Sequence, residues 1–283
     1  MLLNNNIMIT YDDLRRRAHA FELMGRDKMR EAIACWSELV HVAPHDAVMW
    51  SHWGLCLMAI GARDAALEKF NIAISIDPGI KCAWMGRGNC TMALGISDAS
   101  ALHDFTHVLD MFAAEEGINN DTGGIDTSNS VMTMNIKLAV NTSSRMLKEQ
   151  VLYARGCCLF NMGRFREAVE DLDRVIANNA VMYSAALLRG MCHAHLGAHD
   201  AAIIDYTRAI LLLSARSADV HRLVGIWKLR SDSHKATNNW NAAMSDLSTA
   251  ICLLGPTSDA ESAALIQEFS RVLLAAASQK SSA

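Results

Sequence analysis

The sequence carries no excess charge of either sign and contains little proline. Lys and Arg number 26 against 30 Asp and Glu, which leaves a net charge of −4. So small an imbalance, without long runs of like charge, argues against nucleic acid or an anionic membrane as the main partner. Apolar residues make up 51% of the 283 positions and only three residues are proline, so the chain can build a continuous core.

Membrane-spanning and secretory segments are also missing from the sequence. No stretch of 18 apolar residues occurs, and residues 1–6 lack the apolar run of a secretory signal. Residues 15–17 are three arginines, but they follow two aspartates and fit a first helix better than a mitochondrial presequence. We therefore expect a soluble, cytoplasmic protein.

Sequence motifs of catalysis and of metal binding are absent too. None of the eight cysteines forms a CxxC pair, which predicts buried free thiols in a reducing compartment rather than zinc ligands or disulfides. The phosphate-binding patterns GxGxxG and GxxxxGK[ST], the nucleophile pattern GxSxG and the zinc pattern HExxH do not occur. The chain is therefore predicted to be no enzyme and to need no cofactor.

What the sequence does contain is a 34-residue period in both halves of the chain. Like residues separated by this step are Trp50/Trp84, Gly54/Gly88, Gly61/Gly95, Pro44/Pro78, Arg155/Arg189, Gly156/Gly190, Gly163/Gly197, Ala168/Ala202 and Asp171/Asp205. Self-similarity at this spacing is typical of stacked helix–turn–helix units, because one such hairpin cannot bury its apolar face alone. The period predicts an all-α solenoid, and solenoids mostly bind other macromolecules.

The second unit shows the pattern of small and large residues most fully. Its first helix carries Trp50, Trp53, Gly54 and Leu57, Gly61 makes the turn, its second helix carries Ala66, Phe70 and Ala73, and Pro78 closes the unit. Gly54 and Ala66 let two backbones approach closely, while Trp50 and Phe70 fill the space around them. The unit resembles a tetratricopeptide repeat (TPR). This resemblance implies a right-handed α-solenoid of about six helix–turn–helix units with a C-terminal capping helix.

The repeats define four segments along the chain. We expect units one to three over residues 13–112, an insert over 113–143, units four to six over 144–255 and the capping helix over 257–279. The insert contains Asn- and Gly-rich turn chemistry at 119–124, which predicts a mobile segment with a short helix near its end. A hidden degenerate unit is the alternative, because Gly88 and Gly156 are 68 residues apart, twice the period.

Two further features concern the last units. The step from Arg189 to Arg230 is 41 residues, which predicts longer helices or a larger loop between the fifth and sixth units. Ser258 and Glu261 form a capping box for the last helix. The apolar face of that helix is expected to cover the open end of the stack, and it consists of Leu265, Phe269, Val272 and Leu273.

Arginine recurs just before the small-residue slot of four first helices, each time with an acid in the second helix of its own unit. The pairs are Arg87 with Asp104, Arg155 with Asp171, Arg189 with Asp205 and Arg230 with Asp246. Four equivalent pairs favour a structural role, because catalysis would need one special pair. We expect an ion pair within each unit that fixes helix register at little net gain in stability.

Histidines raise the question of a metal site. His103 and His107 lie four apart, on one helix face beside Asp104, and three more histidines cluster at 193–199. Zinc needs further ligands of fitting geometry, and no metalloenzyme signature accompanies these residues. Histidines at the surface or between helices are the better interpretation, so no metal is predicted.

The resemblance to TPR proteins implies that ligands bind on the concave surface of the stack, at the positions of each first helix that face inward. The expected partner-binding groove consists of Ser51, Leu55, Met58, Met85, Asn89, Met92, Tyr153, Phe160, Leu187 and Met191. TPR proteins that clamp the acidic tails of heat-shock chaperones carry Lys and Arg at such slots, and these are missing here, so chaperone C-terminal tails are disfavoured. An apolar, Met-rich groove suits a helix or an apolar peptide. The alternative is that tight curvature buries these residues.

These observations predict a non-enzymatic protein-interaction scaffold or assembly subunit. The alternative function is that of an RNA-associated helical-repeat protein. That function needs basic residues along one face, and the neutral groove argues against it.

Overall fold

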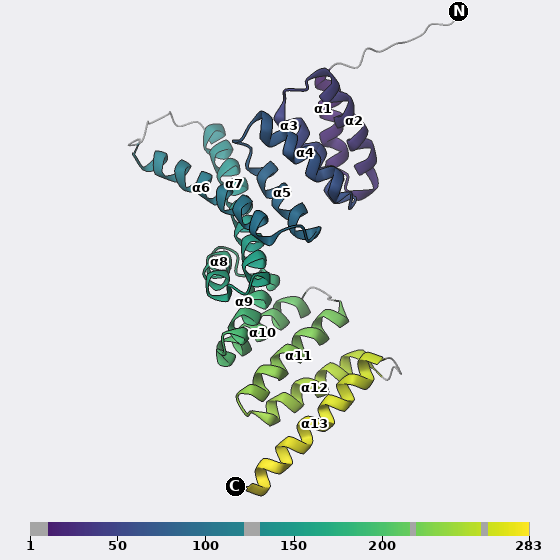
Figure 1. Ribbon diagram of the computed structural model, residues 1–283, viewed down its shortest axis with the longest axis vertical. Coiled ribbons are helices and arrows are strands. Elements are labelled where there is room, and N and C mark those ends of the chain that lie inside the picture. The colour runs from purple at the N-terminus through teal and green to yellow at the C-terminus, as the bar shows by residue number, and fades with distance from the viewer. Residues whose placement is uncertain (1–10, 122–130, 216–218, 256–259, 283) are drawn as a thin grey trace, which may run out of the picture. The chain divides into compact units, whose positions relative to one another are not determined.

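The computed structural model describes residues 11–121, 131–215, 219–255 and 260–282, and the regular structure in these ranges is helical throughout (Figure 1). The helices are α1 (Tyr11–Leu23), α2 (Met29–Val42), α3 (Ala47–Ala59), α4 (Arg63–Ile76), α5 (Lys81–Ala93), α6 (Asp98–Asp121), α7 (Val131–Asn161), α8 (Phe165–Asn178), α9 (Tyr183–His195), α10 (His199–Ser214), α11 (Val220–Ala236), α12 (Trp240–Leu254) and α13 (Ala260–Ser282), with a 3₁₀ turn at Arg26–Lys28. Their order matches six hairpins followed by a capping helix, and the all-α prediction is confirmed.

The chain divides into two compact units, and the division falls between Cys158 and Leu159, inside α7. The first unit contains α1 to α6 and most of α7, and the second contains α8 to α13. The segment boundaries expected at 112/113 and 143/144 remain predictions.

In the first unit, the hairpins α1/α2, α3/α4 and α5/α6 stack in chain order, with α2 against α3, α4 against α5, and α3 beside α5. The ring of Phe70, on α4, explains the spacing of the small residues. A Cβ added at Gly54 would lie 2.7 Å from this ring, and one added at Gly86 would lie 2.3 Å from it. Since no side chain fits there, α3 and α5 both pack directly on Phe70, which is fully buried.

The same close packing recurs in the later hairpins. A Cβ at Gly88 would lie 2.8 Å from the ring of Phe105, and one at Gly190 would lie 2.8 Å from the ring of Tyr206. Each ring is buried, so the large-residue slot of the repeat is filled as expected. The turn at Gly61 is also confirmed: its φ of 86° lies in the left-handed region that favours glycine, and its amide closes the end of α3.

In the second unit, α8 packs on α9, α9 on α10, α10 on α11, α11 on α12, and α12 on α13. The helices α10 and α11 have 16 and 17 residues against 13 in α9, which accounts for the longer step predicted between the fifth and sixth units. Among the described residues, no helix combines the length and the apolar character needed to span a membrane.

The capping helix α13 buries part of its predicted apolar face. Leu265 and Val272 are buried and Phe269 packs beside them in a cluster that also contains residues of α11 and α12. Leu273 was expected on the same face, but it is 50% exposed, so this assignment is wrong. Its position directly after Val272 turns it about 100° away from the packed stripe. Ser258, the first member of the predicted capping box, lies outside the described residues.

The predicted insert differs from what the structure shows. Residues 113–121 continue α6, so the expected irregular chain is wrong over this range, while residues 131–143 begin α7 near the end of the insert, where a short helix was expected. The physical reason lies in residues 113–116, which are strong helix formers, and in ion pairs from Glu115 to Lys81 and from Glu116 to Lys148. Residues 122–130 lie outside the described part of the chain, and the mobility of the segment remains a prediction.

Candidate functional site

Three of the four predicted Arg–Asp pairs are present in the structure. In each pair, the arginine donates two parallel hydrogen bonds, from Nε and Nη2, to the two oxygens of one carboxylate: Arg87–Asp104, Arg189–Asp205 and Arg230–Asp246. The N–O distances are 2.8 and 2.6 Å for Arg87 and 2.9 and 2.6 Å for Arg230. Arg155 and Asp171 lie in different compact units, and their pairing remains a prediction.

The third guanidinium nitrogen of these arginines connects neighbouring hairpins. Nη1 of Arg189 lies 2.7 Å from a carboxylate oxygen of Asp173 on α8, and Nη1 of Arg230 lies 2.8 Å from the hydroxyl of Thr207 on α10. Each arginine therefore contacts the second helix of its own hairpin and that of the preceding hairpin. This bidentate, recurring geometry is that of a structural element rather than of a reactive site.

The aspartates of these pairs are almost completely buried, and a histidine lies near each of them. His193 is 3.8 Å from Asp205 and His234 is 3.8 Å from Asp246. Burial lowers the pKa of His234, although the charge of Asp246 opposes this effect. Asp205, through its hydrogen bonds, raises the pKa of Arg189 above its ordinary value. These carboxylates are already neutralised by arginine, which leaves them poorly suited to bind a substrate.

The predicted groove residues of the first unit lie on α3 and α5, which are neighbours. Leu55 and Met58 pack partly against the core around Phe70, while Met85 and Met92 pack partly against the core around Phe105. All four side chains are half-buried, and so is the polar side chain of Asn89 on α5.

Ser51 does not belong to an accessible groove. Its side chain is fully buried, and its hydroxyl lies 3.1 Å from Sγ of Cys82 on α5. Its assignment as a partner-binding residue is therefore wrong. The reason is that α3 and α5 touch along this line, so the slot faces the next hairpin instead of solvent.

The remaining predicted groove residues are divided between the two compact units. Tyr153 lies in the first unit, on α7, and is half-buried. Phe160, Leu187 and Met191 lie in the second unit and are half-buried too. The ring of Phe160 contacts His195, with 5.5 Å between ring centroids. The surface that the structure brings together is thus the part formed by α3 and α5.

A cavity of about 550 Å³ lies between α4, α5 and α6, and sequence reasoning missed it. Its lining includes Asn71, Arg87, Thr91 and His103. Nη1 of Arg87 lies 3.4 Å from the amide oxygen of Asn71, so the polar groups of the cavity already contact one another. The cavity follows from the spacing of adjacent second helices and has no motif in the sequence.

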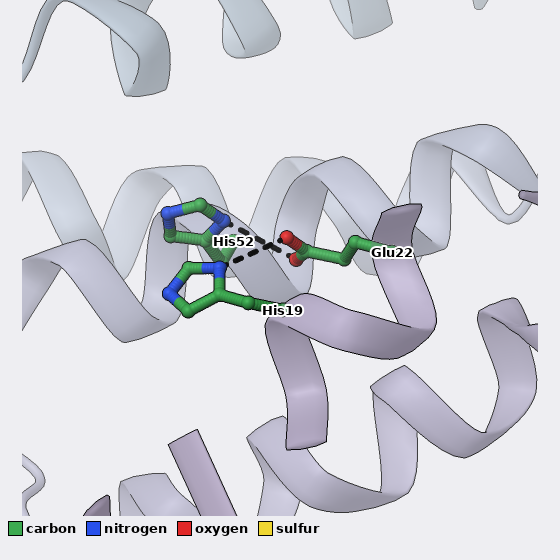
Figure 2. A group of neighbouring side chains, drawn as sticks. All are labelled: His19, Glu22 and His52. Atoms are coloured by element: carbon green, nitrogen blue, oxygen red, sulfur yellow. Dashed lines mark hydrogen bonds and ion pairs between the residues drawn. The ribbon is translucent and has the colours of Figure 1, made fainter. Parts of the chain in front are cut away.

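One group of described residues brings three potential metal ligands together, namely His19, Glu22 and His52, whose ligand atoms lie within 4.8 Å of one another (Figure 2). The sequence prediction of metal ligands did not consider them. His19 and Glu22 are three residues apart, on one face of a helix, which was a weak signal available from the sequence. Their proximity to His52 depends on the stacking of two hairpins and could not be read from spacing.

Comparisons with known proteins show which proteins this chain resembles. Residues 153–219 match the family model described as "Tetratricopeptide repeat". A comparison with curated protein sequences finds no match.

Several solved structures are similar to this chain. YrrB, described as a TPR protein with an unusual peptide-binding site, is 16% identical with a TM-score of 0.58, over 82% of this chain and 97% of its own. PilW, a type IV pilus biogenesis factor, is 15% identical with a TM-score of 0.62, over 88% and 95%. PilF of Pseudomonas aeruginosa is 13% identical with a TM-score of 0.61, over 92% and 96%. At these identities the likeness shows the fold, and it confirms the predicted solenoid of TPR-type hairpins.

Proposed function

We propose that this tetratricopeptide-repeat protein is a non-enzymatic scaffold or assembly subunit that holds an apolar peptide or helix against α3 and α5. The contact surface, called the α3–α5 groove below, consists of Leu55, Met58, Met85, Asn89 and Met92. Helical-repeat folds present extended surfaces to other macromolecules, which supports a binding role. Peptide binding by YrrB, a protein of the same fold, is consistent with it.

The observation that carries the proposal is the partial exposure of these five side chains. If the curvature of the stack closed the groove, they would be buried as completely as Ser51. Instead all five keep part of their surface in solvent, and the four apolar ones also pack on the core. A partner that covers the exposed parts would remove apolar surface from water at about 25 cal/mol per Å².

The chemistry of the groove indicates the kind of partner. Three of its five members are methionines, whose flexible side chains adapt to irregular apolar surfaces. Asn89 is the polar member, and the groove contains no Lys or Arg to pair with a carboxylate or a phosphate. This composition supports an apolar peptide or helix over an acidic chaperone tail and over RNA.

We also propose a cytoplasmic location. All eight cysteines are free, and a reducing compartment keeps thiols in this form.

A peptide-display experiment on the purified chain tests the proposed groove. Panning a random peptide library should enrich sequences rich in Leu, Ile, Phe and Met. Binding of a labelled enriched peptide, followed by fluorescence polarisation, should change little between low and high salt, because apolar contacts are not screened. Met85→Glu should weaken this binding at least about tenfold, since a charge would lose its hydration in the complex.

Met146→Glu is the matched control, because Met146 lies on α7 of the same unit and is 56% exposed. It should bind the peptide as the unchanged protein does. Helical content and melting temperature of both variants are compared by circular dichroism. Enrichment of acidic peptides, or equal binding by a folded Met85→Glu variant, would place partner binding elsewhere.

A further inference from the structure

The side chains of His19 and Glu22 on α1 and of His52 on α3 converge on one point between two successive hairpins (Figure 2). Nδ1 of His19 lies 3.3 Å from Oε2 of Glu22, and Nδ1 of His52 lies 3.2 Å from Oε1. Two imidazole nitrogens thus face the two oxygens of a single carboxylate. Among the described residues this is the one group that brings three possible metal ligands so close together.

Neighbouring side chains hold the carboxylate in place. Nε1 of Trp36 donates a hydrogen bond of 2.7 Å to Oε1 of Glu22, and Sγ of Cys56 lies 3.2 Å from the same oxygen. These two donors fix the orientation of the carboxylate between the imidazoles.

The two imidazole rings are oriented by aromatic contacts. The ring of His52 stacks on Trp36, with 4.9 Å between centroids and 16° between planes. The ring of His19 stands edge-on to both, at 4.9 Å from Trp36 and 4.7 Å from His52. Ligand side chains that are already oriented lose little conformational freedom when a metal binds, which favours affinity.

From this arrangement we propose that His19, Glu22 and His52 bind one zinc ion, through Nδ1 of each imidazole and the carboxylate of Glu22. Two nitrogens and one carboxylate oxygen are a ligand set that zinc accepts in a tetrahedral site, whereas calcium and magnesium require mainly oxygen ligands. The ligand side chains are 39%, 21% and 28% exposed, so solvent can reach the group and occupy the fourth position.

Cys56 supports the site without being a ligand. Its thiol is buried and donates a hydrogen bond to the carboxylate of Glu22. Nε1 of Trp36 donates a hydrogen bond to the same carboxylate oxygen of Glu22. Such outer partners orient a ligand and are a general feature of metal sites.

A zinc ion at this place would join α1 to α3 and thereby the first hairpin to the second. The first hairpin packs on the second through α2 and α3. A metal that links two neighbouring hairpins strengthens the interface between them, and such nearest-neighbour interfaces stabilise a repeat stack. This role is separate from the α3–α5 groove, and neither depends on the other.

Metal binding to the purified full chain tests the proposal. After removal of metals with a chelator, the protein is titrated with zinc chloride, and bound zinc is counted by mass spectrometry of the metal. One zinc per chain is expected, with a rise in melting temperature as zinc is added. Cobalt chloride should give the intense visible absorption of a four-coordinate site with nitrogen and oxygen ligands.

Glu22→Gln and His52→Ala should each weaken zinc binding by at least about 100-fold, more than the loss of an outer partner causes. Glu22→Gln keeps an oxygen that can accept the hydrogen bond of Trp36, so a folded variant is available. The control is His221→Ala: His221 lies 3.0 Å from Glu261, yet the pair has no third ligand among the described residues. This variant should bind zinc as the unchanged chain does.

Three results would overturn the proposal. The first is a chain that takes up no zinc, and the second is unchanged zinc binding by the folded Glu22→Gln variant. The third is a thiolate-to-cobalt absorption band that Cys56→Ser removes, because it would replace the three-residue ligand set with another one.

Discussion

At the scale of the residue, the hairpins are stabilised by contacts that recur at equivalent positions. The guanidinium of Arg87 stacks 4.5 Å from the ring of Trp84, and that of Arg230 stacks 4.4 Å from the ring of Trp227. Stacking and bidentate hydrogen bonding together use the flat shape of arginine, which lysine could not replace. The repeated arginine therefore fixes the first helix against two second helices at once.

The pair of Arg230 and Asp246 gives a direct test of this role. The carboxylate of Asp246 is 4% exposed, so Arg230→Ala would leave a buried charge without its partner. We expect a loss of about 3–5 kcal/mol in the free energy of unfolding. Urea denaturation followed by circular dichroism measures it.

Arg222→Ala serves as the control, because Arg222 lies on the same helix and its ion pair with Asp219 is exposed. It should cost at most about 1 kcal/mol. The double variant Arg230→Met, Asp246→Leu should be more stable than Arg230→Ala, since it leaves no unpaired charge. Equal losses for Arg230→Ala and Arg222→Ala would show that the buried pair contributes nothing special.

At the scale of the element, the last helix illustrates how a stack is closed. α13 buries Leu265 and Val272 against α11 and α12, while Leu273 and Leu274 face solvent. One stripe of the helix is therefore packed and the neighbouring positions are exposed. This is the arrangement expected of a helix that covers the apolar end of a repeat array.

Leu265→Ala should destabilise the protein by about 2–5 kcal/mol, because it removes a fully packed side chain and leaves a cavity. Leu265 is 3% exposed, whereas Leu274 on the same helix is 72% exposed. Leu274→Ala should therefore change the free energy of unfolding by no more than about 0.5 kcal/mol. Thermal and urea unfolding of the two variants measure these losses. Equally small losses for both variants would show that α13 does not pack through Leu265.

The hairpins could be predicted from the sequence because their determinants are local and repeated. Gly54 and Phe70 recur 34 residues later as Gly88 and, one residue beyond that step, Phe105, so each packing contact was visible as a period. The continuation of α6 was missed although residues 113–116 are helix formers, and the contact of Glu115 with Lys81, 34 positions away, could not be predicted from spacing. Turn residues at 119–124 masked the helical tendency of the residues before them.

The candidate sites were less predictable than the fold. The carboxylate partners of Arg87 and Arg230 followed from the repeat, but the burial of Ser51 did not, because it depends on how closely α5 lies to α3. The convergence of His19 and His52 likewise depends on the stacking of two hairpins. Period and spacing describe a single hairpin well, whereas lateral contacts depend on how closely neighbouring hairpins stack.

At the scale of the whole molecule, the free energy of unfolding should be the sum of the intrinsic stability of each hairpin and of the interface energies between neighbouring hairpins. Within each compact unit, helices contact the helices that are close to them in the chain order. Contacts of this kind carry a local perturbation only as far as the adjacent repeats. A destabilised hairpin in the second unit should therefore open without unfolding the first hairpins of the chain.

Leu247→Ala tests this expectation, because Leu247 is fully buried at the centre of the cluster formed by α11, α12 and α13. Hydrogen exchange measured by mass spectrometry should become faster in α10 to α13, since these helices share or adjoin the weakened core. Exchange in α1 to α5 should keep the rates of the unchanged protein. Leu253→Ala, at a position that is 38% exposed on the same helix, should leave both regions nearly unchanged. Faster exchange along the entire chain in Leu247→Ala would instead mean that the described helices unfold as one cooperative unit, and the nearest-neighbour description would fail.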